Sequence, residues 1–376
     1  MRSSRRHPCL GPGPPGSPNL SAGPPAATPL RLLIAGGGTG GHLFPALAVA
    51  RAFRAEEPSG EVLLVGRVGG PEERIVPEAG FELETIRIQG LDRDTIWKNV
   101  ALPAVLPTAL RAGLRIVDRF RPEVVLGMGG YVMAPAVAAA RMRRIPYVLH
   151  EKDVRPGLAT RLFAGGAAAI CTTLPGTDER LRSNHVVLTG VPLRPGFEPR
   201  TPAVPPRTLL VTGGSQGARN LNRAVWGALD ELTSMFEHVI HVAGRQGGDG
   251  IAEHRRNRYE GMTFADDMPA VLARADLIVG RAGVGTIAEA AAVGLPMVLV
   301  PGTFGGGHQE DNAAAMVAAG AAVRIADGEL TPAKLVATLR DLQPDQLRSM
   351  AAASAAAGRR DAAERVLDVV REVARR

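Results

Sequence analysis

The chain is poor in cysteine and in aromatic residues. Its 376 residues include only two cysteines, Cys9 and Cys171, too few for a disulfide framework or a structural zinc site. A reducing cytoplasm is therefore the compartment we expect. Phe, Tyr and Trp amount to 4% of the chain, and proteins that stack nucleic-acid bases rely on those side chains. We accordingly expect no nucleic-acid partner.

Long uninterrupted apolar runs are also missing. No stretch offers the ~20 apolar residues that a membrane-spanning helix needs, because the best candidates are broken by Pro103, Pro107, Arg111 and Arg141. Residues 1–29 begin with arginines and continue with Pro and Gly, where a signal peptide has an apolar segment. We interpret 1–29 as a disordered basic leader, or as sequence added by a start codon assigned too early.

Glycine, in contrast, is abundant, with 45 residues that gather in loops after short apolar runs. The runs predict strands, and the stretches after the loops have the apolar spacing of helices. Alternating strands and helices, with strands apolar on both faces, are typical of parallel sheets covered by helices. This unit occurs repeatedly, with glycine loops at 36–41, 127–130, 213–217 and 280–285.

The repeated units group into two halves, because the stretch 190–206 is rich in Pro and Gly and has few core residues. We predict an α/β fold with two doubly wound, Rossmann-like domains that face a central cleft. Ligands bind such sheets beyond the carboxyl ends of the strands, where the glycine loops lie. The expected segments are the leader 1–29, an N-terminal domain 30–190, a C-terminal domain 191–358 and a final helix 359–376.

The first loop fits the G-x-G-x-x-G pattern of dinucleotide sites through Gly36, Gly38 and Gly41. A nicotinamide site of this kind also needs an acidic residue after the second strand to hold the ribose. Here that strand, 62–65, is followed by a Gly-Arg pair, which suits only a phosphorylated ribose. On this pattern an NADP-dependent oxidoreductase stays an alternative.

His42 follows the first loop and falls in the first turn of the expected helix. The positive end of a helix dipole disfavours an imidazolium there, which keeps the ring neutral near pH 7. A neutral imidazole at a cleft can accept a proton from a sugar hydroxyl as a general base. The alternative is a histidine that only hydrogen-bonds the loop or the substrate, and both roles stay open.

Three further positions have a functional and an ordinary interpretation. Ser215 can hold a phosphate at a helix start or simply cap that helix. Glu289 can accept hydrogen bonds from ribose hydroxyls or fold back on Thr286 as part of a capping box. Arg194 can neutralise a diphosphate leaving group or be a solvated linker arginine.

Taken together and in order, motifs along residues 31–375 resemble the MurG family, the peptidoglycan N-acetylglucosaminyltransferases that make lipid II. The motifs are G-G-T-G-G-H at 37–42, G-M-G-G-Y at 127–131, H-E at 150–151, G-G-S-Q-G-A at 213–218, R-A-G at 281–283 with Thr286 and Glu289, and H-Q at 308–309 with N-A at 312–313.

The resemblance implies an enzyme of the glycosyltransferase B fold, which needs no metal or other cofactor. Its donor would be UDP-N-acetylglucosamine and its acceptor undecaprenyl-diphospho-N-acetylmuramoyl-pentapeptide, whose muramoyl 4-hydroxyl receives the sugar with inversion. The N-terminal domain would bind the acceptor and the membrane, the C-terminal domain the UDP-sugar, and the final helix would pack back on the N-terminal domain. Such an enzyme works peripherally at the cytoplasmic face of the cell membrane, in cell wall biogenesis, cell shape and cell division.

Carried over position by position, the resemblance assigns substrate contacts on both sides of the cleft. Residues of the first loop would face the donor sugar, Ser215 and Arg194 its phosphates, and Glu289 its ribose. Ala265 would contact the uracil through its backbone, and Gln309 would hold sugar hydroxyls. The full set is Thr39, Gly40, Gly41, Asp153, Arg194, Ser215, Ala265, Val284, Gly285, Thr286, Ile287, Ala288, Glu289 and Gln309, with His42 as the candidate catalytic base.

Departures from the family pattern occur mainly on the acceptor side. The family's H-E-Q-N reads H-E-K-D at 150–153, an expected asparagine further along is absent near Thr160, and G-N-P-V-R reads G-V-P-L-R at 190–194. The alternatives to the transferase are a UDP-N-acetylglucosamine 2-epimerase, another sugar-nucleotide glycosyltransferase and a non-catalytic sugar-nucleotide sensor.

A lipid acceptor requires an enzyme that rests on an anionic membrane surface, and the segment 86–120 has a suitable pattern. Apolar side chains can enter the headgroup boundary while cations meet anionic lipid, at about 1 kcal/mol per Lys or Arg. The alternative is a buried helix with a solvated face. The apolar residues are Ile88, Leu91, Ile96, Trp97, Val100, Leu102, Val105 and Leu106, and the basic ones are Arg87, Arg93, Lys98, Arg111, Arg115 and Arg119.

Overall fold

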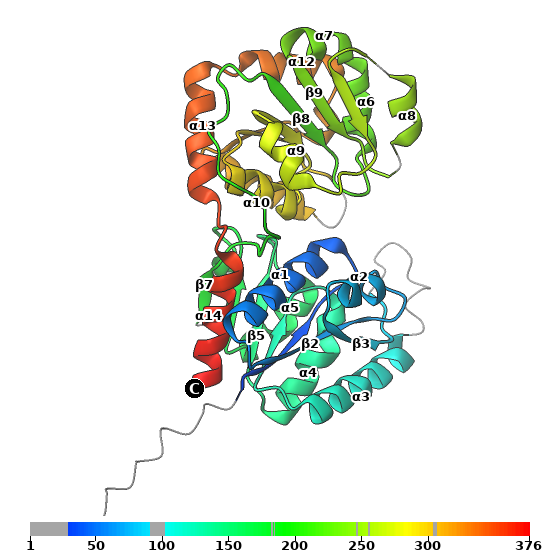
Figure 1. Cartoon of the computed structure of the whole chain (residues 1–376), viewed down its shortest axis with the longest axis vertical. Coiled ribbons are helices and arrows are strands. Elements are labelled where there is room, and N and C mark those ends of the chain that lie inside the picture. The colour runs from blue at the N-terminus through cyan, green and yellow to red at the C-terminus, as the bar shows by residue number, and fades with distance from the viewer. Residues whose placement is uncertain are drawn as a thin grey trace, which may run out of the picture.

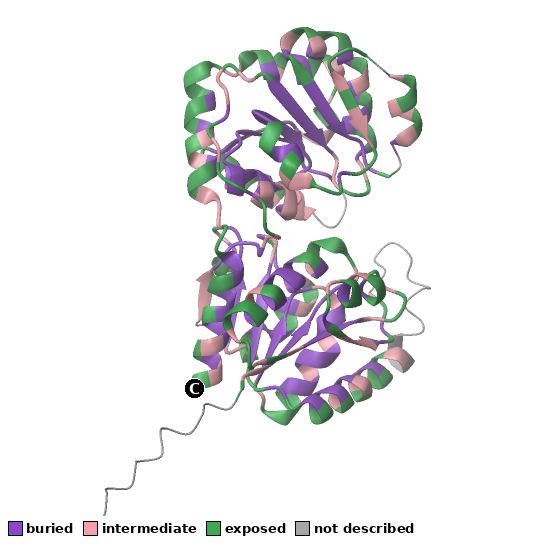
Figure 2. Cartoon of the chain, viewed as in Figure 1, coloured by how far each residue is buried: buried purple, intermediate pink, exposed green. Residues whose placement is uncertain are grey.

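The computed structural model describes residues 29–90, 102–181, 183, 185–245, 247–254, 256–303 and 307–376. It has two α/β domains, one above the other in Figure 1, each built on a parallel sheet. The predicted fold class is therefore confirmed. In both sheets the central strands are buried on both faces, as Figure 2 shows.

The N-terminal domain contains a seven-stranded sheet in the order β3-β2-β1-β4-β5-β6-β7. Its strands are β1 (Arg31–Ala35), β2 (Glu61–Arg67), β3 (Glu82–Ile86), β4 (Val124–Gly127), β5 (Tyr147–Glu151), β6 (Ala169–Thr172) and β7 (Val186–Leu188). Its helices are α1 (Gly40–Glu56), α2 (Glu72–Glu78), α3 (Leu102–Phe120), α4 (Ala134–Arg143) and α5 (Leu158–Phe163).

Alternate residues of β1 supply the two faces of this domain's core, because successive side chains of a strand point to opposite faces. Leu32 and Ile34 pack with α1 on one face. Leu33 and Ala35 pack with α3 and α4 on the other. The glycine loops after β1 and β4 therefore come together at one edge of a sheet that is covered on both sides.

The C-terminal domain repeats this arrangement with six strands in the order β10-β9-β8-β11-β12-β13. The strands are β8 (Thr208–Thr212), β9 (His238–Val242), β10 (Tyr259–Met262), β11 (Leu277–Gly280), β12 (Met297–Leu299) and β13 (Ala322–Arg324). The helices are α6 (Arg219–Gly227), α7 (Leu229–Met235), α8 (Gly248–Glu253), α9 (Met268–Arg274), α10 (Val284–Val293), α11 (His308–Ala318), α12 (Pro332–Asp341) and α13 (Pro344–Ala357).

The last helix, α14 (Ala362–Arg375), leaves the C-terminal domain and lies along the N-terminal one (Figure 1). Its apolar stripe, including Val366, Leu367 and Val370, is buried in the same core as β1 and α1. Arg371 reinforces this contact through ion pairs with Glu56 at 2.6 Å and Glu57 at 3.0 Å. The chain thus crosses between the domains twice.

The segment 86–120 is only partly described, and part of it is core. Ile88, expected to meet the membrane, is buried against the sheet together with Ile116 and Val117 of α3. That expectation was wrong for Ile88, because the chain after β3 continues along the domain's own core. Leu106 near the start of α3 is exposed, as are Arg111 and Arg115 further along the helix. Leu91, Arg93, Ile96, Trp97, Lys98 and Val100 lie outside the described residues.

Among the helices that the structure describes, none is long and apolar enough to cross a membrane.

Candidate active site

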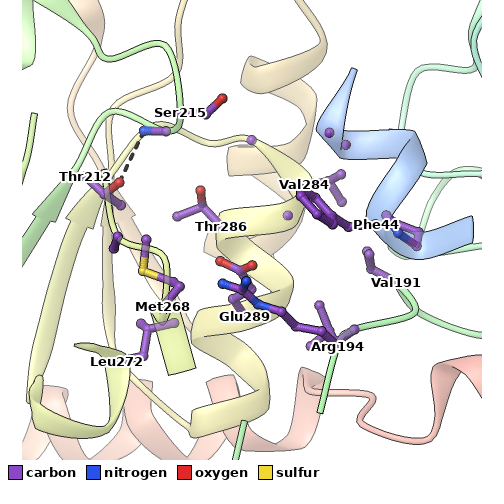
Figure 3. A pocket seen from close by; sticks show the side chains of 18 of the residues that line it. Phe44, Val191, Arg194, Thr212, Ser215, Met268, Leu272, Val284, Thr286 and Glu289 are labelled. Carbon is purple, nitrogen blue, oxygen red and sulfur yellow. Dashed lines mark hydrogen bonds between the residues drawn. The ribbon is translucent and has the colours of Figure 1, made fainter. Parts of the chain in front are cut away.

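A cavity of about 360 Å³ lies between the domains, beyond the carboxyl ends of both sheets. Most of its wall comes from the C-terminal domain, and α1 contributes Gly40, Gly41 and Phe44 from the other side (Figure 3). This volume is in the range of sites that take nucleotide-sized ligands. Nine of the expected substrate residues line it: Gly40, Gly41, Arg194, Ser215, Ala265, Val284, Gly285, Thr286 and Glu289.

Ser215 stands at one end of the cavity, in a turn after β8. Helix α6 begins only at Arg219 and its N-cap is Ala218, so the expected placement of Ser215 at a helix start was wrong. The turn is held by the Gly214 N–H, which donates to Thr212 Oγ1 at 3.2 Å (Figure 3). The Ser215 hydroxyl is exposed toward the cleft and free of a capping role.

Glu289 lies on the second turn of α10 and faces the cavity (Figure 3). The capping-box interpretation was wrong, because the helix begins at Val284 with Gly283 as its N-cap and no side-chain cap bond. Thr286 is thus inside the first turn and also lines the cavity. Burial raises the pKa of Glu289 to about 7, while the charge of Arg194 acts in the opposite direction.

Arg194 is half-buried, and its guanidinium points toward Glu289 in the cavity (Figure 3). Its Nη1 donates to the Asp266 carbonyl at 3.2 Å. This anchor crosses from the interdomain linker to the loop before α9. The cation is therefore held in the wall of the cavity and is not a freely solvated linker residue.

The part of the cavity beside Glu289 is apolar. Met268 and Leu272 of α9 lie on one side (Figure 3), and Ala265 is buried beside them. Val242, the last residue of β9, and Ile278 of β11 also line the cavity. An apolar slot of this kind, next to a carboxylate, suits a planar base followed by a ribose.

His42 sits in the first turn of α1, outside the cavity lining, and packs on the glycine loop after β4. Its Nδ1 lies 3.1 Å from Thr39 Oγ1. A Cβ at Gly129, whose φ is +91°, would fall 2.9 Å from the imidazole, so only glycine leaves room for the ring. Burial lowers the pKa of His42 to about 3, and the Lys152 ammonium contributes in the same direction. The ring is therefore neutral at pH 7.

The other expected substrate residues do not line this cavity. Ile287 and Ala288 lie on the far side of α10, in or against the core. The Gln309 Oε1 accepts the Gly302 N–H at 2.8 Å. Both carboxylate oxygens of Asp153 already have protein partners, Lys152 and Asn312. The Thr39 hydroxyl lies 3.1 Å from His42 Nδ1.

The structure also shows a residue that the sequence patterns did not reveal. Glu72, at the start of α2, is buried, and its carboxylate accepts the Gly38 N–H of the first glycine loop. A Cβ at Gly37 or Gly70 would collide with this carboxylate. Because the Glu72 side chain occupies the loop and accepts its N–H, the pyrophosphate of a dinucleotide has no place there. This finding argues against the NADP-dependent oxidoreductase.

Family models match both domains of the chain. Residues 32–172 match the glycosyltransferase family 28 N-terminal domain, and residues 208–366 match the glycosyltransferase family 28 C-terminal domain. Two relatives carry the name UDP-N-acetylglucosamine–N-acetylmuramyl-(pentapeptide) pyrophosphoryl-undecaprenol N-acetylglucosamine transferase. The one from Nocardioides sp. is 41% identical, over 92% of this chain and 98% of the relative. The one from Moorella thermoacetica is 39% identical, over 91% and 98%.

Solved structures agree on the fold. MurG of Acinetobacter baumannii superposes with a TM-score of 0.77 at 26% identity, covering 92% of this chain and all of that one. A protein of Listeria monocytogenes that is described as a putative UDP-N-acetylglucosamine 2-epimerase has a TM-score of 0.66 at 14% identity, covering 92% of this chain and 96% of that one. The second likeness shows the fold alone, that of two facing doubly wound domains.

Proposed function

Because the chain belongs to the family of UDP-N-acetylglucosamine–N-acetylmuramyl-(pentapeptide) pyrophosphoryl-undecaprenol N-acetylglucosamine transferases, we infer that it catalyses that transfer. It is a glycosyltransferase of peptidoglycan synthesis that takes N-acetylglucosamine from UDP-N-acetylglucosamine. The sugar goes to the lipid-linked muramoyl-pentapeptide and yields lipid II. The cavity between the domains is the observation that carries the assignment of the site.

We propose that UDP lies in the C-terminal wall of this cavity. The apolar slot beside Met268 and Leu272 takes the uracil, and the Glu289 carboxylate accepts hydrogen bonds from the ribose hydroxyls. The diphosphate then extends toward Ser215 and the first turn of α10, whose free N–H groups and dipole favour an anion. Arg194 adds a cation on the same wall. These groups stabilise the departing UDP without a metal.

The donor sugar projects toward Gly40 and Gly41, the part of the wall that belongs to the N-terminal domain. The acceptor hydroxyl attacks its anomeric carbon from the face opposite the leaving UDP, with inversion through an oxocarbenium-like state. His42 Nε2 takes the proton of that hydroxyl. Its Nδ1, beside Thr39 Oγ1, is the nitrogen that carries the ring's own proton.

The test is release of UDP by the full chain in the presence of a lipid-linked muramoyl-pentapeptide, with the product identified by mass. Release without sugar on the lipid would contradict the transfer, and conversion of the donor to its 2-epimer would favour the epimerase. Binding of UDP with no turnover under any condition would favour the non-catalytic sugar-nucleotide sensor.

We also propose that the N-terminal domain rests on an anionic membrane at the cytoplasmic face. Leu158 and Leu162, one turn apart on α5, are 54% and 67% exposed, with Arg161 between them. Two large apolar side chains on one short surface helix are suited to the headgroup boundary, where the arginine meets anionic lipid. Helix α5 directly follows the loop 152–157, which lies at the cleft. A membrane on this surface would therefore place the lipid of the acceptor close to the N-terminal side of the active site.

A further inference from the structure

Asn312, near the middle of α11, is fully buried, and its amide group contacts both domains. Its Oδ1 accepts the Val154 N–H at 3.1 Å, and its Nδ2 donates to Asp153 Oδ1 at 3.0 Å. Both partners belong to the loop after β5 in the N-terminal domain. The same Nδ2 donates to the Ala282 carbonyl of the C-terminal domain at 3.2 Å. Both polar atoms of the amide are thus used.

The N-terminal side of this contact is rigid. The buried Glu151 carboxylate accepts the N–H groups of Asp153 at 3.1 Å and Gly157 at 3.0 Å, which fixes the loop that follows β5. Asp153 Oδ2 is paired with Lys152 Nζ at 2.6 Å. Val154 itself is buried in the core of the C-terminal domain. The loop therefore presents a fixed set of groups to Asn312.

On the C-terminal side, Asn312 contacts the residue that precedes α10, the helix that lines the proposed UDP site. Ala282 immediately precedes Gly283, the N-cap of α10, and α10 carries Thr286 and Glu289 into the cavity. Asn312 thus links the carbonyl before the donor-side helix to the loop after β5. That loop lies beside the base candidate, since a Cβ at Gly41, the residue before His42, would lie 3.9 Å from Lys152 Cε.

A second, outer contact joins the same elements. Asp311 pairs with Arg155 Nε at 2.9 Å and with Arg180 Nη1 at 3.3 Å. Both arginines belong to the N-terminal domain and are about half exposed. Helix α11 therefore meets the N-terminal domain through a buried amide and an outer carboxylate on successive residues.

We propose that Asn312 is a positioning residue, which sets the orientation of the two domains in which transfer takes place. This inference rests on the proposed function. The attacking oxygen and the anomeric carbon come from different domains, and a misplacement of about 1 Å can lower the rate about 100-fold. UDP binding, in contrast, depends on the C-terminal wall alone. Loss of the Asn312 contacts should therefore lower kcat and leave UDP affinity in place.

The first experiment uses Asn312→Asp and the double variant Asp153→Asn with Asn312→Asp in the full chain. Asp at 312 still accepts the Val154 N–H but sets one carboxylate against another. Asn at 153 then supplies a donor for the 153–312 pair from the opposite side, whereas the bond to the Ala282 carbonyl is not restored. We expect the single variant to lose about 100-fold in kcat, and the double variant to recover at least about 10-fold of that loss.

The readouts are kcat with the lipid acceptor and the Kd of UDP by calorimetry. UDP affinity should stay within about threefold, since Asn312 does not line the cavity and only its bond to the Ala282 carbonyl reaches the residues before α10. Glu310→Ala is the matched control, because Glu310 is exposed on the same helix and pairs with Arg324 inside the C-terminal domain. A proportional loss of UDP affinity, or a double variant no better than the single one, overturns the positioning role.

If Asp at 312 prevents folding, the outer contact gives a second test, in which the arginines are about half exposed and Asp311 is partly buried. Replacing both Arg155 and Arg180 by Glu sets like charges against Asp311, and we expect a loss of about fivefold in kcat that Asp311→Lys reverses. An unchanged kcat overturns the inference. A wild type that transfers no sugar to the lipid acceptor overturns the proposed function instead, so the two failures are distinguishable.

Discussion

Glu289 provides a pH test of the ribose contact. Burial raises the pKa of its carboxyl to about 7, so the group is mostly protonated at pH 6 and mostly ionised at pH 8. The carboxylate can accept one ribose hydroxyl at each oxygen, whereas protonation turns one of these oxygens into a donor and weakens the pairing. Affinity for UDP-N-acetylglucosamine should therefore rise about 10-fold between pH 6 and pH 8 and level off above that. The intact donor is the right ligand, because its diphosphate does not titrate in this range.

The matched variant is Glu289→Gln, which keeps the shape of the side chain and cannot ionise. We expect its Kd for the donor to be at least about 10-fold weaker at pH 8 and independent of pH. Calorimetric titration at three pH values measures both properties. A variant that keeps the rise with pH would assign the titration to another group and remove Glu289 from the ribose site.

His42 can be separated from a merely hydrogen-bonding histidine by two substitutions. Its pKa of about 3 means that the ring is neutral throughout pH 5–8, so its own titration gives no slope to kcat in that window. If it is the base, His42→Ala and His42→Gln should both lower kcat by about 10²–10⁴-fold. The affinity for UDP should hardly change, because His42 lies outside the cavity. Glutamine keeps a hydrogen bond but takes no proton, so activity in that variant would refute the base role.

For single residues, the sequence patterns predicted many of those that line the cavity, but the predicted placement of some of them within the helices was wrong. The spacing of Thr286 and Glu289 fits a capping box, yet the N-cap of α10 is Gly283, three residues earlier than Thr286. Glu72 and Asn312 belong to no short pattern that reveals their partners. Their contacts join residues 34 and 158 positions apart, which only the folded chain brings together.

Helix α14 is the last element of the chain, yet it packs in the core of the N-terminal domain. Leu367 is 1% exposed in the N-terminal core, although it follows the whole C-terminal domain. Leu367→Ala should lower the free energy of unfolding of the N-terminal domain by about 2–5 kcal/mol, through lost burial and a cavity. Urea unfolding followed by far-UV circular dichroism measures this loss.

Glu372→Ala on the same helix is the control. Glu372 is exposed and forms a local ion pair with Arg376, four residues further along, so its removal should change stability by no more than about 0.5 kcal/mol. UDP affinity should be equal in both variants. A Leu367 variant as stable as the control would mean that α14 does not hold the N-terminal domain together.

The elements themselves were largely predictable, since short apolar runs closed by glycine are a strong signal of strands in a covered parallel sheet. The segment 86–120 was not, because apolar periodicity alone cannot separate a membrane face from a core face. Ile88 and Ile116 are buried in the N-terminal core. Leu158 and Leu162 are exposed, although no pattern in the sequence distinguishes them.

For the whole molecule, the repeated units were enough to predict two facing domains, whereas their mutual orientation depends on side chains far apart in sequence. The same limit holds for the surface that meets the membrane. The chain carries a net charge of +7, which favours anionic surfaces in general, so charge alone does not say which face docks. The exposed leucines of α5 make that question testable.

The intact protein should float with anionic vesicles of phosphatidylglycerol and much less with neutral ones, and salt should weaken the binding. Withdrawing one leucine side chain from water stabilises by about 1.5–3 kcal/mol, so Leu158→Ser with Leu162→Ser should weaken vesicle binding at least about 10-fold. Val317→Ser is the control, because Val317 is an exposed apolar residue on the C-terminal domain. Equal flotation of both variants would rule out α5 as the docking element, and loss of flotation in the control alone would place the membrane against the other domain.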